Sequence, residues 1–246
     1  MTLAIYRQDD GGTVIYVRPM RISEIFYSIQ GEGILAGVPS VFIRTTGCNL
    51  RCTWCDTPYT SWKPEGYQMM YGAMLTEVRR HWCGHVVITG GEPMILPDLV
   101  ELTEKIKEID QHITIETAGT SYQKVHCDLM SISPKLSNST PHEREDGKFA
   151  AQHEELRYQP DVLKQLIAEY DYQLKFVISS LDDVREARDV VREIGAERDK
   201  VLLMPEGTTR DVLNERAKWL VDVCKDFGYR YCPRLHIDIW GNKRGV

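Results

Sequence analysis

The stretch that decides the fold is VFIRTTGCNLRCTWCDT, residues 41–57. Its first five residues are apolar or β-branched at all positions but one, which is typical of a strand covered on both faces. The glycine and the three cysteines that follow break this pattern and predict a loop at the carboxyl end of the strand. Since functional sites of α/β proteins gather at such ends, this loop is a candidate site.

Strand-like and helix-like segments alternate beyond this stretch. Short β-branched runs predict strands, and longer runs with apolar residues at helical spacing predict helices. The predicted strands are 41–45, 85–89, 113–117, 129–133, 173–178 and 201–204, with a last strand within 231–237, and the predicted helices are about 72–81, 96–110, 159–170, 181–194 and 210–227. This alternation implies βαβ units and a parallel sheet. Because eight units cannot be found, the expected fold is α/β with an open, partial (β/α) barrel.

Two segments fall outside the alternation. Residues 1–20 predict an N-terminal extension in the form of a hairpin, because Asp10-Gly11-Gly12 is a turn signal between two apolar runs. Residues 137–158 are polar and rich in turn residues, which predicts a surface insertion or mobile loop. No domain boundary is evident, so residues 1–246 are expected to form a single domain.

Composition excludes several classes of function. The chain has 30 Lys and Arg against 36 Asp and Glu, a formal net charge of −6, and 42% hydrophobic residues. This balance is ordinary for a globular protein and gives no electrostatic reason to expect nucleic acid or an anionic membrane as partner. No run approaches the ~20 apolar residues of a membrane span, and the first residues lack a signal-peptide pattern. The expected location is the cytoplasm.

Three of the seven cysteines, Cys48, Cys52 and Cys55, are close together in the sequence. An odd number of cysteines without a signal sequence argues against a disulfide framework. Soft thiolates select iron–sulfur clusters, Cu(I) or zinc, and structural zinc normally takes four protein ligands. No second Cys or His pair is present to complete a zinc site. A [4Fe–4S] cluster held by three cysteines instead keeps one iron free for a small molecule.

CxxxCxxC with Trp54 before its last cysteine resembles the signature of the radical S-adenosylmethionine (SAM) enzymes. The turn after the next predicted strand, GGEP at residues 90–93, is similar to the SAM site of these enzymes. Its glycines allow close approach of the backbone, and Glu92 offers an acceptor for the ammonium group of SAM. SPK, residues 133–135, is a third candidate element. Taken alone, GGEP also suits a strand-to-helix turn, and SPK suits a polar strand end.

Longer motifs resemble one family among these enzymes, the 7-carboxy-7-deazaguanine synthases. They follow in the order EIF (24–26), QGEG (30–33), FIR (42–44), CTWCDT (52–57), TGGEP (89–93), ETAG (116–119) and SPK (133–135). The resemblance is dense over about residues 20–136 and thins beyond them to LKFV (174–177), MP (204–205) and His236. Members often carry Gln-Pro where this chain has Met204-Pro205, and the end of this chain also departs from theirs.

The resemblance implies a homodimer with an open, partial (β/α)6-type barrel of the radical SAM kind and an extra C-terminal strand. It implies a [4Fe–4S] cluster, SAM and Mg²⁺, and an electron donor such as flavodoxin or ferredoxin. The implied reaction is a carbon–nitrogen lyase step that converts 6-carboxy-5,6,7,8-tetrahydropterin into 7-carboxy-7-deazaguanine with loss of ammonia, towards queuosine and related deazapurines. The cofactors carry the difficult chemistry in such enzymes, while the protein orients them and excludes water.

The resemblance also implies a role for each matching residue. The cluster ligands would be Cys48, Cys52 and Cys55, and the Mg²⁺ ligand would be Thr57. Contacts to SAM would come from Trp54, Cys55, Asp56, Gly91, Glu92, Ser133, Pro134, Lys135, Met204, Pro205, Glu206 and Gly207. Contacts to the substrate would come from Ile29, Gln30, Gly31, Arg44, Thr89, Glu116 and His236. Arg44 would bind the substrate carboxylate and Glu116 its donor edge.

Other interpretations stay open. Glu116 also suits a structural salt bridge, and Thr57 suits a cap of the turn before Pro58. A glycyl-radical activating enzyme that acts on a partner protein shares CxxxCxxC, although QGEG and CDT argue against it. A non-catalytic iron–sulfur or zinc module would leave GGEP and SPK without a role.

Overall fold

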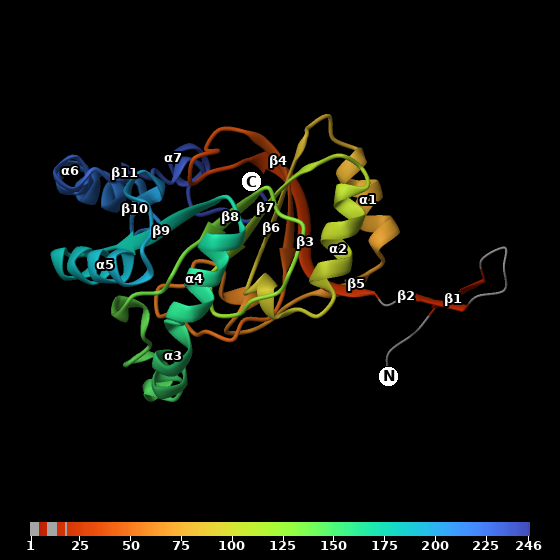
Figure 1. The fold of residues 1–246 in the computed structure, drawn as a ribbon, viewed down its shortest axis with the longest axis horizontal. Helices are drawn as coiled ribbons and strands as arrows, with labels where there is room; N and C mark the ends of the chain where they lie inside the picture. Colours follow the sequence, from red (N-terminus) through yellow and green to blue (C-terminus); the bar gives the residue numbers. More distant parts are fainter. Residues whose placement is uncertain (1–4, 9–13, 18) are drawn as a thin grey trace.

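One nine-stranded sheet forms the frame of the protein (Figure 1). The computed structural model describes residues 5–8, 14–17 and 19–246. The strand order is β11-β10-β9-β8-β7-β6-β4-β3-β5. Its parallel strands are β4 (Pro39–Thr45), β6 (His85–Thr89), β7 (His112–Thr117), β8 (Leu129–Ile132), β9 (Tyr172–Ile178), β10 (Val201–Pro205) and β11 (Arg230–Tyr231). On one side β4 pairs with the antiparallel strand β3 (Met20–Ile29), which in turn pairs with β5 (Tyr67–Met69).

The sheet is open, as predicted for a partial (β/α) barrel. Its edge strands β5 and β11 lie at opposite ends of the strand order and do not pair with each other. The six predicted strands correspond to β4 and β6–β10, and β11 is an additional C-terminal strand. Their apolar runs are buried throughout β8, β9 and β10, because helices or loops cover both faces.

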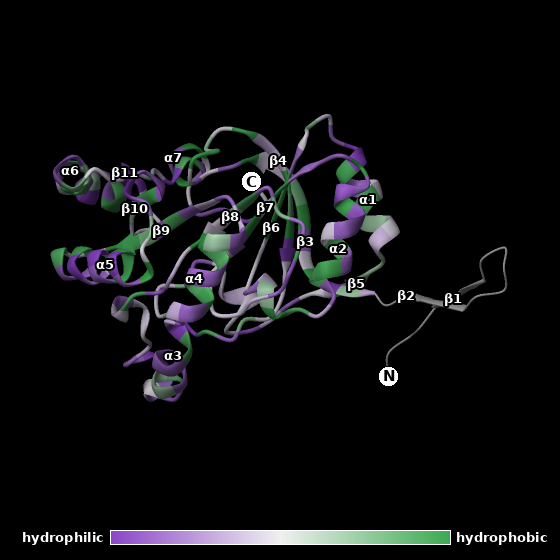
Figure 2. Ribbon diagram, viewed as in Figure 1, coloured by the Kyte–Doolittle hydropathy of each residue, from purple (hydrophilic) through white to green (hydrophobic). Residues whose placement is uncertain are grey.

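Helices follow most of the parallel strands and bury one face against them. They are α1 (Tyr71–Arg79), α2 (Leu99–Lys107), α3 (Ala150–Arg157), α4 (Pro160–Glu169), α5 (Leu181–Ile194), α6 (Arg210–Phe227) and α7 (Leu235–Trp240). In Figure 2 these helices carry both hydrophobic and hydrophilic residues. Ile106 of α2, Leu166 of α4 and Leu220 of α6 are fully buried in one core with the strands. None of the helices in the described part of the chain has the length and apolar character needed to span a membrane.

The prediction of a strand within 231–237 was wrong over most of that range. β11 ends at Tyr231, and the helix α7 begins at Leu235. Pro233 lies between them and lacks the N–H group that a continued strand would need for pairing.

The two segments outside the alternation both contain secondary structure. β1 (Ile5–Gln8) pairs antiparallel with β2 (Val14–Val17), while the expected turn at Asp10-Gly11-Gly12 lies outside the described residues.

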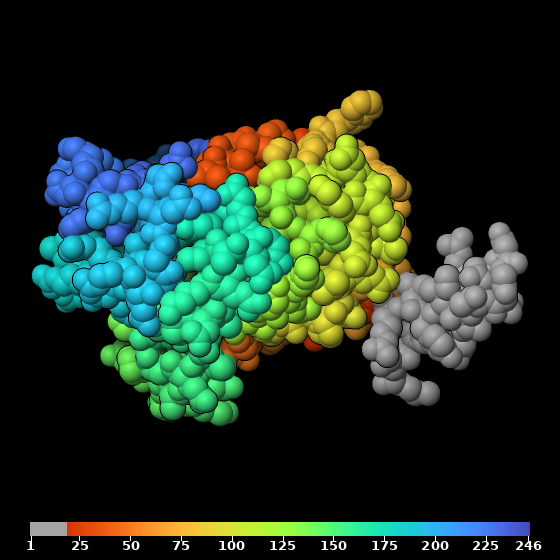
Figure 3. Space-filling model, viewed as in Figure 1, coloured from red at the N-terminus to blue at the C-terminus, as the bar shows by residue number. Residues whose placement is uncertain are grey.

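Residues 137–158 contain the short helices η3 (Ser137–Ser139) and η4 (Arg144–Gly147) followed by α3. In Figure 3 the region of α3 is a green lobe on the edge of the molecule. The segment therefore folds into short helices rather than a plain loop, and it buries Ser139 of η3 and His153 of α3.

The start of α5 offers a test of local stability. The Ser180 hydroxyl accepts a hydrogen bond from the backbone N–H of Asp183, and the Asp183 carboxylate accepts one from the backbone N–H of Ser180. Ser180→Ala removes half of this capping box and should lower the free energy of unfolding by about 1 kcal/mol. Urea denaturation measures the loss. Asp182→Ala in the same turn is the matched control, because that side chain is 84% exposed and should change stability little. Equal stability of the two variants would contradict the capping role.

Candidate active site

A cavity of about 660 Å³ opens where the parallel strands end. Its wall includes Arg44 at the end of β4, Thr89 at the end of β6 and Glu116 at the end of β7. Parallel strands end at one edge of a sheet, so loops that are far apart in the sequence meet there. The volume is in the range that holds small molecules.

The three cysteines of the loop after β4 all face this cavity. Among the residues that the structure describes, no three His, Cys, Asp or Glu side chains lie close enough to hold one metal ion. Three cysteine side chains from one short loop nevertheless provide the soft sulfur donors that an iron–sulfur cluster takes. Burial raises the pKa of Cys48 to about 12 and also raises that of Cys52, so without a bound cation both remain thiols. Iron bound beside them would supply the positive charge that holds them as thiolates.

The Gly90-Gly91 turn after β6 lies directly against the start of the cysteine loop. A Cβ atom on Gly91 would lie 2.0 Å from the carbonyl oxygen of Gly47, and one on Gly90 would lie 2.2 Å from that of Thr45. The backbone N–H of Glu92 also donates to the Gly47 carbonyl at 2.9 Å. Only glycine permits this approach, which brings the GGEP turn beside Cys48.

Glu92 has a different position from the one expected. Its side chain is fully buried, and it is absent from the cavity wall. The carboxylate accepts hydrogen bonds from the hydroxyl of Thr117 at 2.7 Å, the N–H of Ala118 at 2.7 Å and the N–H of Met94 at 3.0 Å. Both oxygens accept hydrogen bonds from the protein, and the buried carboxylate lies behind the cavity wall in this structure rather than facing the space where SAM was expected. It instead joins the turn after β6 to the end of β7.

The remaining residues expected at SAM divide into two groups. Trp54, Asp56, Ser133, Lys135 and Met204 line the cavity together with Cys55 and Gly91. The residues that do not line it are Pro134, Pro205, Glu206 and Gly207.

Two members of the second group support the wall from behind. Glu206 forms an ion pair with Arg216 of α6, and the Gly207 carbonyl accepts a hydrogen bond from Arg234. They hold the turn after β10 in place rather than face the cavity.

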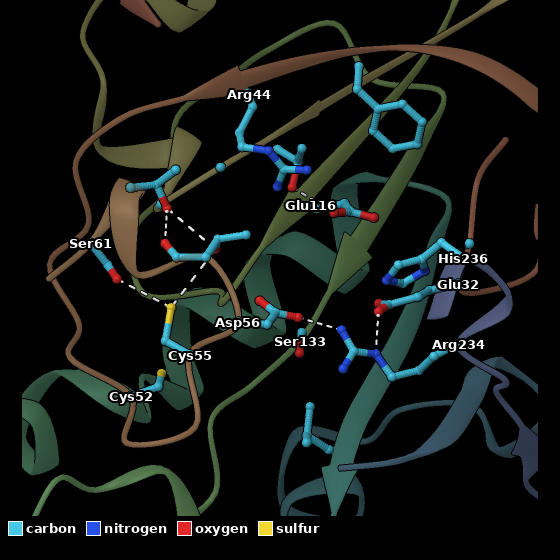
Figure 4. A pocket seen from close by; sticks show the side chains of 18 of the residues that line it. Glu32, Arg44, Cys52, Cys55, Asp56, Ser61, Glu116, Ser133, Arg234 and His236 are labelled. Carbon is cyan, nitrogen blue, oxygen red and sulfur yellow. Dashed lines mark hydrogen bonds and ion pairs between the residues drawn. The ribbon is translucent and has the colours of Figure 1, made fainter. Parts of the chain in front are cut away.

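All seven residues expected at the substrate line the cavity. The carboxylate of Glu116 accepts hydrogen bonds from the Thr89 hydroxyl at 2.7 Å and from the Gln30 amide at 3.2 Å (Figure 4). Both partners are neutral, so these contacts orient the carboxylate without cancelling its charge. The geometry favours a binding role for Glu116 over a structural salt bridge.

Arg44 lies beside this group, because parallel pairing of β4 with β6 makes Arg44 the register partner of Thr89 (Figure 4). Its Nε pairs with Glu24 Oε1 at 2.7 Å, and its guanidinium lies 5.3 Å from the centre of the Phe26 ring. Glu24 is shared, since it also accepts hydrogen bonds from Arg244 Nε at 3.0 Å and from the Tyr59 hydroxyl at 3.2 Å. The shared carboxylate fixes the orientation of Arg44 while only partly neutralising two arginines.

Four residues near the end of the chain, Asn242, Lys243, Arg244 and Val246, also line the cavity. Sequence reasoning missed them, because this stretch departs from the family pattern and has no periodicity. The helical spacing of His236 and Ile239 on α7 likewise does not indicate that the residues after this helix face the cavity.

A buried ionic network, also missed, joins three loops of the wall. Arg234 pairs with Glu32 at 3.0 Å and also with Asp56, which follows the last cysteine (Figure 4). Lys175 of β9 pairs with the same Glu32, and the side chains of Arg234 and Lys175 are only 7% and 6% exposed. Burial alone would raise the pKa of Glu32, but Lys175 and Arg234 outweigh it and hold this pKa well below its usual range. The glutamate of QGEG and the lysine of LKFV were visible in the sequence as motif members, but their pairing was not.

His236 and Thr57 complete the wall. The ring of His236 lies so close to Gly31 that a Cβ atom on Gly31 would be 2.0 Å from the ring Nδ1, and burial lowers the pKa of this histidine.

Thr57 precedes the short helix η1 (Pro58–Thr60) at its N-cap, but its side chain makes no capping hydrogen bond. Its hydroxyl lies 3.9 Å from the sulfur of Cys55. It also accepts a hydrogen bond from the Thr60 hydroxyl at 3.4 Å, which leaves its second lone pair for a ligand.

Comparisons with known proteins identify the family. The family model for the Radical SAM superfamily matches residues 42–138. The chain is 46% identical over 226 residues to the 7-carboxy-7-deazaguanine synthase of Rhodopirellula baltica, a match that covers 92% of this chain and 88% of that one. It is 43% identical over 232 residues to the 7-carboxy-7-deazaguanine synthase of Halobacterium salinarum, covering 90% of each chain.

Two solved structures share the fold. QueE from Escherichia coli superposes with a TM-score of 0.68 at 24% identity, over 88% of this chain and 94% of that one. SuiB from Streptococcus suis, bound to S-adenosylmethionine, superposes with a TM-score of 0.51 at 14% identity, over 76% of this chain and 48% of that one. Together with the sequence identities over nearly the whole chain, these matches show that the protein belongs to the 7-carboxy-7-deazaguanine synthase family of radical SAM enzymes.

Proposed function

We propose that this protein is a 7-carboxy-7-deazaguanine synthase that converts 6-carboxy-5,6,7,8-tetrahydropterin into 7-carboxy-7-deazaguanine with loss of ammonia. The observation that carries the proposal is that the cysteine loop and the polar group of Gln30, Thr89 and Glu116 line the same cavity, with Arg44 on its wall. One cavity thus combines residues that can hold a radical-generating cofactor with residues that can bind a small polar heterocycle carrying a carboxylate. Anaerobic turnover of the carboxytetrahydropterin with SAM and a reductant is the direct test.

The cysteine loop would hold the [4Fe–4S] cluster through Cys48, Cys52 and Cys55, and SAM would lie near Trp54, Asp56 and Gly91. When bound, the cluster and SAM supply the one-electron reductive chemistry that starts hydrogen abstraction from the pterin. The protein itself binds and orients. Its walls also limit the access of water to the reacting groups, because the Lys175–Glu32 and Arg234–Glu32 ion pairs in them are largely buried.

Substrate recognition uses two opposite charges at strand ends of the cavity wall, Arg44 on β4 and Glu116 on β7. The Arg44 guanidinium can bind the pterin carboxylate in bidentate form, since Glu24 engages only its Nε. The Glu116 carboxylate can accept hydrogen bonds from the N–H edge of the heterocycle, because its present partners are neutral. His236, whose pKa is lowered by burial, would be neutral at neutral pH and can offer a hydrogen bond without adding charge.

Mg²⁺ is a further part of the proposal. The ion prefers hard oxygen ligands and takes only one or two from the protein, with the rest from substrate and water. Thr57 supports such a site because its hydroxyl lines the cavity without a capping hydrogen bond. From family membership we also propose a homodimer that receives electrons from a flavodoxin or ferredoxin.

The cluster is tested by metal content. Anaerobically reconstituted protein should contain about four irons per chain and show broad visible absorbance. Cys52→Ala should lose both, because a cavity-lining ligand is removed. Cys83→Ala is the control and should keep both, since Cys83 lies outside the cavity and its sulfur contacts the carbonyl of His85. Stoichiometric zinc in place of iron in the anaerobic protein would refute the assignment.

Carboxylate recognition is tested at Arg44. Arg44→Lys keeps the positive charge but loses the bidentate geometry, and a charge-assisted hydrogen bond is worth about 1.5–3 kcal/mol. The expected fall in kcat/KM is about 10–100-fold, with an unchanged cluster spectrum. Arg21→Lys is the control, because Arg21 is exposed and donates to the carbonyl of Pro64. A normal kcat/KM for Arg44→Lys would end this assignment.

The magnesium site is tested by adding and removing the ion. Turnover should rise with Mg²⁺ and fall with a chelator of divalent cations, and Thr57→Ala should lose most of this response. Thr57→Ser retains the hydroxyl and should keep it. If the unaltered enzyme does not respond to Mg²⁺ or to chelator, the magnesium proposal fails and the rest of the proposed function stands.

A further inference from the structure

The middle of the cysteine loop is held from outside the cavity by residues 136–157. The backbone N–H of Arg51, between Cys48 and Cys52, donates to His153 Nδ1 at 3.1 Å. The backbone N–H of Thr53 donates to the Ser139 carbonyl at 2.8 Å. Each contact joins residues about 90–100 positions apart in the sequence. Part of residues 137–158, whose polar sequence suggested a surface insertion, therefore packs on the cysteine loop.

Both nitrogens of His153 are used. Because Nδ1 accepts the Arg51 N–H, the ring proton is assigned to Nε2, which donates to the Ser139 hydroxyl at 2.8 Å. That hydroxyl donates in turn to the carbonyl of Leu136 at 2.6 Å. His153 is only 1% exposed, and burial lowers its pKa to about 4, so the acceptor nitrogen is present at neutral pH. The result is a directed chain of hydrogen bonds from the loop into the protein.

Other contacts from outside the cavity satisfy the neighbouring polar atoms of the loop. The indole of Trp62 donates to the Cys52 carbonyl at 3.0 Å, and the Arg144 guanidinium donates to the Thr53 carbonyl at 3.2 Å. Arg144 also stacks on the Trp62 ring at 3.8 Å from its centre. The backbone around Cys52 is thus fixed by the protein itself, without help from a bound group. His153 bonds a backbone N–H of the three-residue span between Cys48 and Cys52, while the Asn49 side chain in this span bonds the Thr120 hydroxyl at 3.0 Å.

We propose that His153 is a positioning residue for the iron–sulfur cluster, and that its Ser139-anchored imidazole fixes the backbone between Cys48 and Cys52. This inference rests on the proposed function, because it requires that the three cysteines hold a cluster. Groups that orient metal ligands commonly change metal retention 10–100-fold when they are removed, and hydrogen bonding around a cluster sets its reduction potential. His153 therefore acts through Arg51 on how firmly the cluster is held and how readily it is reduced.

The test compares three variants with the unaltered protein. His153→Phe retains an aromatic ring but removes the acceptor, whereas His153→Asn places an amide oxygen near the position of Nδ1. Gln152→Ala, at the exposed neighbouring position of α3, is the matched control. The readouts are iron loss to a chelator after anaerobic reconstitution, the midpoint potential of the cluster without SAM, and thermal unfolding of the metal-free chain.

His153→Phe should lose iron about 10–100-fold faster and show a shifted midpoint potential. His153→Asn should recover most of both properties, and Gln152→Ala should match the unaltered protein. Iron retention and potential of His153→Phe equal to those of the unaltered protein would overturn the inference. If metal-free His153→Phe does not fold, Ser139→Ala decides, because it removes only the hydroxyl that anchors the ring, and normal iron retention there would overturn the inference too. Failure of the unaltered protein to bind a cluster would instead refute the proposed function.

Discussion

The close contact between two loop backbones determines the form of the site. The Gly90-Gly91 turn after β6 lies against Thr45 and Gly47 after β4, where no Cβ atom could fit. Parallel pairing of β4 with β6 brings the two loops side by side, and the hydrogen bond from Glu92 to Gly47 fixes their distance. The Glu92 carboxylate then extends the connection to the end of β7. Three consecutive strand ends are thereby joined behind the cavity wall before any cofactor binds.

A network of buried ion pairs holds another part of the cavity wall in place. Arg234 and Lys175 are nearly inaccessible to solvent, and such cations are tolerated only when paired. Glu32 pairs with both, and Asp56 provides the second anion for Arg234. Removal of one partner from a buried pair typically costs about 3–5 kcal/mol, because the other charge is left without compensation. The network therefore ties the QGEG loop, the end of the cysteine loop and the approach to α7 into one rigid unit.

These two sets of contacts, with the His153 chain on the outer side, surround the cysteine loop. The glycine turn sets where the loop begins, His153 and Ser139 fix its middle, and Arg234 holds its end through Asp56. The cysteine side chains face the cavity together with Leu50, Trp54 and Asp56 of the same loop. Preorganisation of this kind means that a bound group meets ligands already close to their final arrangement, which matters because small displacements of reacting atoms cost large factors in rate.

The sequence by itself determined the alternation of the six main parallel strands with their helices, the open sheet and the cysteine loop, and its family motifs pointed to seven residues that line the cavity. It could do so because hydrophobic period, glycine turns and clustered cysteines are local patterns, and because parallel strands bring their carboxyl ends together. Only the tertiary structure decided that Glu92 lies behind the wall, that Arg234 joins Glu32 and Asp56, and that His153 holds Arg51. Arg234 lies 202 residues from Glu32 and 178 from Asp56 along the chain. Such partners share no period or spacing, so their meeting follows from how the whole sheet and its loops pack rather than from any local pattern.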